Sequence, residues 1–101
     1  MNDLDRVIHE PTRLRILMIL SGVDAADFNF LLSALELTSG NLSSHLDRLE
    51  KSGYIEIRKS FQGKIPKTDC RLSKTGRAAL ANYWHTIDNI RSRPAVHEHK
   101  G

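Results

Sequence analysis

The stretch that decides the fold runs from Leu37 to Gly53 and has the sequence LTSGNLSSHLDRLEKSG. Its leucines Leu42, Leu46 and Leu49 follow at steps of four and three residues, the spacing that places apolar side chains on one face of a helix. Thr38 stands where an N-cap is expected, and Gly53 stands where a residue that ends a helix is expected. The stretch therefore predicts a helix from Thr38 to about Ser52, with one apolar face and a small, polar beginning.

Two shorter helices are predicted upstream of this stretch. Residues 1–10 form a short arm, and Pro11 suits the first turn of a helix because that turn needs no N–H donor. Apolar residues at helical spacing predict a buried helix over 11–21, which Gly22 ends. A second, brief helix is predicted from a cap at Asp27 or Asn29 to about Glu36, and residues 37–38 form the turn before the long helix.

A β-hairpin and a last helix are predicted downstream. Residues 54–61 alternate with β-favouring side chains, residues 62–66 are turn formers, and residues 67–73 form the returning strand. Ser73 or Thr75 is the candidate cap of a helix that continues toward Pro94. The expected organisation is therefore a single domain over 1–91 and a flexible polar tail over 92–101.

These elements define a fold class. Three helices, a tight turn before the third, a two-stranded hairpin and a closing helix form a mainly α chain with a small β-sheet, an α+β fold of the winged helix-turn-helix plan. A short strand that completes the sheet is expected near 27–28.

With this order of elements, the sequence resembles small bacterial and archaeal winged-helix transcriptional regulators of the MarR-like and ArsR-like kind. The resemblance covers about residues 8–91 and rests on the stretches Pro11–Leu17, Leu37–Leu46, Leu49–Ile55 and Leu72–Arg77. It implies a protein that binds DNA and forms a dimer.

The third helix has the side chains that DNA recognition needs. A helix that enters the major groove needs small, hydrogen-bonding groups at its N-terminal end, because bulky apolar groups would keep it away from the bases. Asn41 has the amide that pairs with adenine, and His45 and Arg48 are expected on the exposed side, within reach of phosphates or base edges. The candidate recognition residues are Ser39, Gly40, Asn41, Ser43, Ser44, His45 and Arg48. The alternative is that residues 39–41 are only a polar helix start.

The hairpin is the second candidate DNA element, or wing. Residues 53–77 contain seven Lys and Arg against two acidic residues, so the positive charge is concentrated there. Lys64 lies at the expected tip, where it would follow a phosphate strand or enter a minor groove. The candidate wing residues are Arg58, Lys59, Lys64 and Lys67. The alternative is that these cations only keep the hairpin soluble.

The terminal segments suggest a dimer. Apolar residues recur at helical spacing on the last helix, and the N-terminal arm adds three more. A homodimer that buries them would place two recognition helices about 34 Å apart, one turn of DNA. The candidate interface residues are Leu4, Val7, Ile8, Leu80, Tyr83, Trp84, Ile87 and Ile90. The alternative packs Trp84 against its own domain.

Composition excludes other classes of protein. The chain has 101 residues, a formal net charge of +3 and one cysteine, Cys70, so neither an internal disulfide nor a Cys pair for zinc is expected. No apolar stretch is long enough to span a bilayer and the N-terminus is acidic, which favours a soluble protein of the cytoplasm. No catalytic motif, cofactor motif or built metal site is found, and the pair His97 and His99 is expected to bind metal only adventitiously.

The sequence therefore favours a homodimeric repressor that binds double-stranded DNA and is not an enzyme. Two alternatives stay open: a winged-helix module that docks a protein partner without reading DNA, and a protein that binds structured RNA. A small-molecule effector is compatible with the sequence, but no residue identifies one.

Overall fold

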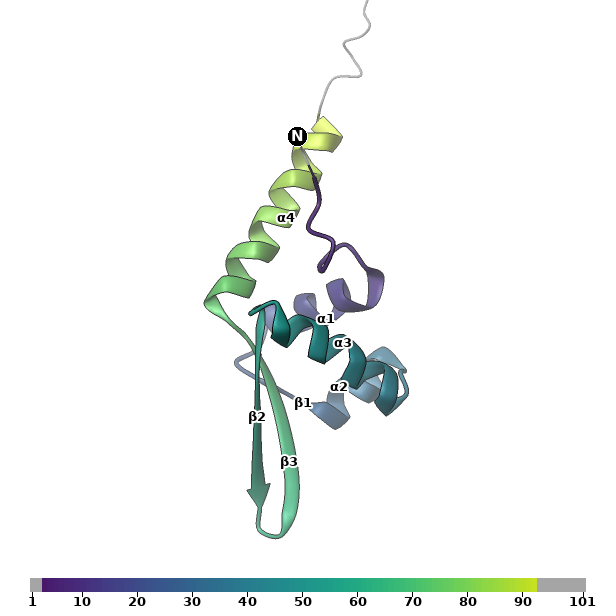
Figure 1. The fold of residues 1–101 in the computed structure, drawn as a ribbon, viewed down its shortest axis with the longest axis vertical. Coiled ribbons are helices and arrows are strands. Elements are labelled where there is room, and N and C mark those ends of the chain that lie inside the picture. Colours follow the sequence, from purple (N-terminus) through teal and green to yellow (C-terminus); the bar gives the residue numbers. More distant parts are fainter. Residues whose placement is uncertain (1–2, 93–101) are drawn as a thin grey trace, which may run out of the picture.

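The structure of the chain is a computed structural model, and it describes residues 3–92. The elements follow in the order α1 (Pro11–Ser21), β1 (Ala26–Asp27), α2 (Phe28–Leu35), α3 (Ser39–Lys51), β2 (Ile55–Gln62), β3 (Ile65–Leu72) and α4 (Lys74–Ser92). The first three helices form one cluster, the hairpin projects from it, and α4 extends in the opposite direction (Figure 1). This is the expected α+β plan, and the helix boundaries agree with the predicted ones to within two residues.

Side-chain caps explain where the helices begin. Thr38 Oγ1 accepts the N–H of Asn41 at 3.1 Å, and the Asp27 carboxylate accepts the N–H groups of Asn29 and Phe30. These bonds satisfy backbone donors that have no partner inside the helix. The predicted caps Thr38 and Asp27 are confirmed, and the Ser73 hydroxyl caps α4 by accepting the N–H of Gly76 at 2.9 Å.

The two helices of the helix-turn-helix end in the same way. Gly53 has a φ of 80°, its N–H donates to Glu50, and the next N–H, from Tyr54, donates to Leu49. This pair of bonds is a Schellman motif, which turns the chain out of α3 and into β2. The end of α2 has the same pattern with Glu36 at a φ of 55°. A non-glycine residue in this conformation costs about 1 kcal/mol, so the tight turn into α3 is made against a local preference.

The sheet has the strand order β1-β3-β2, with both pairs antiparallel. The predicted turn over 62–66 is too long, because Gln62 pairs with Ile65 and only two residues, Gly63 and Lys64, form the turn. Pro66 lies inside β3 opposite Phe61. In an antiparallel pair of strands, residue pairs joined by backbone hydrogen bonds alternate with pairs that are not. Gln62 and Ile65 close the turn, so the next pair, Phe61 and Pro66, needs no backbone N–H, and a proline is tolerated.

The core lies where α1, α2 and α3 meet the base of the hairpin. Leu42, Leu46 and Leu49 of α3 are buried there together with Ile55 and Cys70 of the sheet. The three predicted apolar positions of the long helix are therefore confirmed as core.

Three residues predicted for a dimer interface belong to this core. Ile8, Leu80 and Tyr83 are between 0% and 5% exposed within the chain itself, and the phenol of Tyr83 is 2.8 Å from Nδ1 of His9. The N-terminal segment folds back against α4, so intramolecular packing accounts for their burial and the prediction of an intermolecular surface is corrected for these three. Leu4, Val7 and Ile87 are partly buried, whereas Trp84 and Ile90 remain 39% and 45% exposed.

The last helix ends close to the expected limit of the domain. Helix α4 continues to Ser92, one residue past the expected boundary, and the rest of the predicted tail lies outside the described residues.

Within residues 3–92 no helix combines the length and the apolar character needed to cross a membrane.

The start of α4 lies close to the backbone of Tyr54, the residue that directly precedes β2. A Cβ added to Gly76 would lie 2.7 Å from the carbonyl carbon of Tyr54, whereas a Cβ added to Gly40 in α3 would have open space. We predict that Gly76→Ala lowers the free energy of unfolding by about 1 to 3 kcal/mol, because backbone must move. The matched variant Gly40→Ala should raise it by up to about 1 kcal/mol. Urea unfolding measures both values, and equal stabilities of the two variants would contradict the close approach.

Candidate nucleic-acid interface

The first turn of α3 presents a small, polar surface. Its buried leucines fix the rotation of the helix, so the remaining side chains face outward. The N–H groups of Ser39 and Gly40 make no hydrogen bond within residues 3–92 and remain available to an anion at the positive end of the helix dipole. Exposed here are the predicted residues Ser39, Gly40, Asn41, Ser43, Ser44 and Arg48.

His45 differs from the prediction. It was expected on the exposed side, but its side chain is only 23% exposed and lies against the start of α1. Arg13 Nη1 is 3.3 Å from His45 Nδ1, and Glu10 Oε1 is 3.8 Å from the same atom. Because a guanidinium has only donors, Nδ1 accepts in the bond to Arg13 and the ring proton is on Nε2. Only Nε2 is therefore left to donate to a ligand.

Arg13 is a positioning residue that the sequence analysis missed. Its Nε donates to the carbonyl of Val7 at 2.6 Å and its Nη2 to that of Arg6 at 3.4 Å, while its backbone N–H bonds the Glu10 carboxylate. The guanidinium thus joins the N-terminal segment to His45 on α3. The only sequence signal was the unusual place of an arginine, directly before an apolar residue in the first turn of a buried helix.

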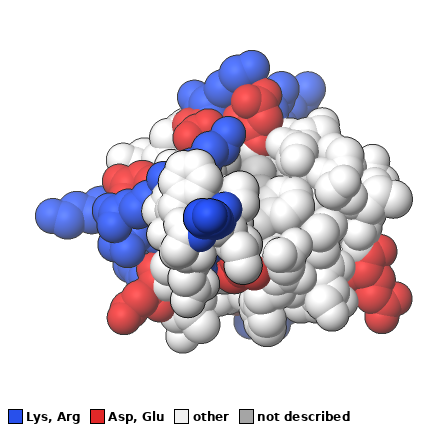
Figure 2. Space-filling view, turned by 90° about the horizontal axis from the view of Figure 1, so that it is seen from below, with Lys and Arg blue, Asp and Glu red and all other residues white. Residues whose placement is uncertain are grey.

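The wing carries free cations. Arg58, Lys59 and Lys64 are exposed and Lys67 is half-buried, and within residues 3–92 none of the four forms an ion pair. The view from the wing tip shows Lys and Arg groups at the tip and along one side, with a few carboxylates between them, and a mostly uncharged surface opposite (Figure 2). The basic hairpin predicted from the sequence therefore projects from the domain, and its four candidate cations are not held in ion pairs within residues 3–92.

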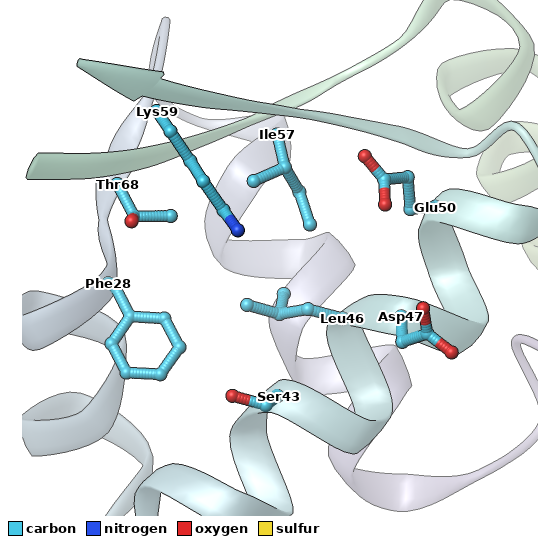
Figure 3. Close-up of a pocket in the computed structure, with 8 residues that line it drawn as sticks. All are labelled: Phe28, Ser43, Leu46, Asp47, Glu50, Ile57, Lys59 and Thr68. Atoms are coloured by element: carbon cyan, nitrogen blue, oxygen red, sulfur yellow. The ribbon is translucent and has the colours of Figure 1, made fainter.

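A hollow separates the wing from α3. Its volume is about 650 Å³ and its lining residues are Phe28, Ser43, Leu46, Asp47, Glu50, Ile57, Lys59 and Thr68. The Lys59 ammonium points from β2 into this hollow, and Asp47 and Glu50 lie across from it on α3 (Figure 3). Asp47 also pairs with Lys51 at 3.0 Å. The positive charge of Lys59 therefore offsets part of the negative charge of Asp47 and Glu50 on this side of α3.

Cys70 is a core residue. It is fully buried on β3, between Ala26 of β1 and Ile57 of β2. Burial, and secondly the nearby carboxylates of Asp69, Glu50 and Asp27, raise the pKa of its thiol to about 11. The thiol is therefore protonated at neutral pH, as expected for a packing residue.

No group of three or more potential metal ligands is present in the part of the chain that the structure describes. The predicted pair His97 and His99 lies outside those residues.

Comparison with known proteins identifies the fold family. A family profile described as a winged helix DNA-binding domain matches residues 12–90. The chain belongs to this family. An uncharacterised protein of Methanocaldococcus jannaschii is 37% identical over 83 residues, which are 81% of this chain and 89% of that protein.

Solved structures share the winged helix fold. A transcriptional regulator homologue from Pyrococcus horikoshii OT3 superposes with a TM-score of 0.81 at 25% identity, over 86% of each chain. Two structures below 25% identity show the fold alone. MepR from S. aureus, solved in complex with DNA, has a TM-score of 0.72 at 17% identity, over 86% of this chain and 71% of that one. A MarR-family regulator from Silicibacter pomeroyi has 0.64 at 23% identity, over 87% and 58%.

These comparisons confirm the winged-helix resemblance. The family and the fold are those of DNA-binding transcription regulators and not of an enzyme. The MarR-family structure shares the fold alone, so the MarR-like and ArsR-like parts of the resemblance stay predictions.

The state of Cys70 leads to a labelling prediction for this winged helix protein. At pH 8 the native thiol should react with a thiol-specific aromatic disulfide at least about a hundredfold more slowly than the unfolded chain, because it is buried and its pKa is about 11. Absorbance of the released thiolate in native buffer and in urea measures the two rates. Fast native labelling would show an exposed thiolate and would contradict the assignment of Cys70 as a packing residue.

Proposed function

We propose that this winged helix protein is a homodimeric transcriptional repressor of the cytoplasm that binds a pseudo-palindromic site in double-stranded DNA. One observation carries the proposal: the exposed, small and polar first turn of α3 stands beside a projecting hairpin whose cations have no ion-pair partners within residues 3–92. A surface used only for protein docking has no need of both features.

In the proposed complex, α3 enters the major groove. Asn41 pairs with adenine, the serines bond bases or phosphates, and Arg48 reaches a guanine or the backbone. The open space around Gly40 allows the helix to approach the DNA closely, and the unbonded N–H groups of the first turn receive a phosphate. His45 contributes its Nε2 donor from a position fixed by Arg13.

The wing supplies affinity in this proposal. Arg58, Lys59, Lys64 and Lys67 lie along the backbone or in the adjacent minor groove, where they release counterions and bind without regard to sequence. The S. aureus MepR structure was solved with DNA, which supports this use of a shared fold.

The dimer is proposed to form through α4. This helix has 19 residues and extends away from the DNA-binding elements (Figure 1). Trp84 and Ile90 are exposed on it, and Ile87, Leu4 and Val7 are only partly covered. An apolar surface of this kind is buried when two copies pair. Repression is proposed because occupying promoter DNA requires no further partner.

A titration of mixed-sequence short duplexes tests the DNA part of the proposal. We expect selection of a two-fold related motif and affinity that falls steeply with salt. Lys64→Ala should weaken binding to all sequences alike and reduce the salt slope by about one, whereas Asn41→Ala should cost about 1 to 3 kcal/mol at one base position. Equal losses on selected and random duplexes for Asn41→Ala would contradict its role. A protein that prefers structured RNA, or that binds no duplex at low salt, would contradict the function.

Light scattering tests the dimer. The wild-type protein should have about twice the chain mass of 11.4 kDa, and Trp84→Glu should shift it to the monomer, because a carboxylate cannot be buried unpaired in the interface. Phe30→Glu is the matched control, since Phe30 is an exposed aromatic on α2 and its replacement should leave the dimer intact. A wild-type mass of one chain, or dissociation by the control alone, would rule out this interface.

A further inference from the structure

The wing tip is apolar as well as basic. The positive charges of the wing do not explain why apolar side chains are exposed at its tip. Phe61 and Ile65, which flank the turn, are 73% and 69% exposed, the highest values among the large hydrophobic side chains of the described residues. Strands rise about 3.3 Å per residue, so Phe61 lies about 13 Å beyond Ile57, the last residue of β2 that is in contact with the core. Folding therefore gains little from an aromatic side chain at this position.

The register assigns the two residues to opposite faces of the hairpin. Residues directly opposite each other on paired strands share a face, and faces alternate along each strand. Phe61 is paired with Pro66 and lies on the face of Ile57 and Lys59, whereas Ile65 is paired with Gln62 on the other face.

The face of Phe61 is the one that looks toward the recognition helix. Lys59 and Thr68, which share it, line the hollow opposite Ser43 of α3 (Figure 3). Phe61 and Pro66 thus extend this face beyond the hollow, on the side where α3 would contact DNA.

The residues around Phe61 and Pro66 indicate which ligand binds there. Residues 57–68 contain four cations and no carboxylate: Lys59 shares the face of Phe61, Lys64 lies in the turn, and Arg58 and Lys67 lie on the other face. An apolar group at the tip of a hairpin that carries cations on both faces matches the minor groove, which has phosphates at its walls and sugar and base surfaces inside. An acidic protein partner or an anionic membrane would meet the same charges, but neither would account for the shared side with α3.

We propose that Phe61, supported by Pro66, is an apolar wedge that enters the minor groove beside the major groove occupied by α3 and opens a base step there. The inference rests on the proposed DNA-binding function and adds a contact that bends the duplex and favours flexible, A·T-rich steps. The lysines position the tip on the backbone, and Phe61 supplies the contact that depends on DNA deformability.

Duplex binding by Phe61→Ala and Ile65→Ala tests the wedge. The two variants remove equally exposed side chains from the same tip, but from opposite faces, so Ile65→Ala is the matched control. On the pool of mixed-sequence duplexes, Phe61→Ala should bind about tenfold more weakly with an unchanged salt slope, because it loses a stacking contact and no charge. Bending, measured by energy transfer between duplex ends, should fall as well. Ile65→Ala should equal the wild type in both, and thermal melting should be the same for all three proteins.

A second measurement identifies the groove. Inosine in place of guanine removes the minor-groove amino group and leaves the major-groove acceptors in place. The wild-type protein should bind the inosine pool more tightly than the guanine pool, and Phe61→Ala should not distinguish them.

The outcomes separate the wedge from the function on which it rests. Duplex binding by the wild type with no loss in Phe61→Ala would overturn the wedge and leave the regulator intact, as would equal losses in both variants. Absence of any duplex binding by the wild type would overturn both. Wild-type binding to phosphatidylglycerol vesicles that is lost in Phe61→Ala, with duplex binding unaffected, would assign the tip to a membrane and overturn the wedge.

Discussion

The burial of one face of α3 is the constraint on which the rest of the structure depends. Leu42, Leu46 and Leu49 are between 0% and 2% exposed, and turning the helix about its axis would expose them at about 1.5 to 3 kcal/mol each. The rotation of α3 is therefore fixed by the core and not by any contact on its outer side. That leaves the first turn free to carry small polar side chains that add little to folding and that suit the DNA contact proposed for them.

The N-terminal segment also holds α3 in place, through a contact just after the C-terminal end of the helix. The Asp5 carboxylate accepts the N–H groups of Val7 and Ile8 and the hydroxyl of Tyr54, which directly follows the turn that ends α3. This bond is the main reason why the pKa of Tyr54 is raised to about 12, so the phenol remains a donor throughout the neutral range. Together with the contact between Arg13 and His45, it ties α3 to a segment that also packs on α4. The element proposed to read DNA and the helix proposed to form the dimer thus share one support.

How far the sequence predicts this structure depends on the range of the interactions involved. The extent of α3, its Thr38 cap and the turn at Gly53 depend on neighbours within a few residues, and they were predictable for that reason. The burial of His45 depends on Arg13, 32 residues away, and that of Tyr83 is tied to His9, 74 residues away. Periodicity places both residues on a helix but cannot tell which neighbour covers them. The hairpin turn shows a third case: residues 62–66 all favour turns by type, and only strand pairing decides that Ile65 and Pro66 belong to β3.

The hairpin extends far beyond the core, so the residue types near its tip are not explained by folding. Beyond Ile57 and Cys70 the strands leave the core, and from there to the turn they meet no helix of residues 3–92 except across the hollow that Lys59 enters. Side chains on this part add almost nothing to the free energy of folding, and a long exposed hairpin carries a risk of aggregation, which charged residues reduce. Solubility alone accounts for the lysines but not for an exposed phenylalanine among them. The aromatic side chain therefore supports the proposed contact with DNA, because it lies on the face of the hairpin that is directed toward α3, the helix proposed to bind the same duplex.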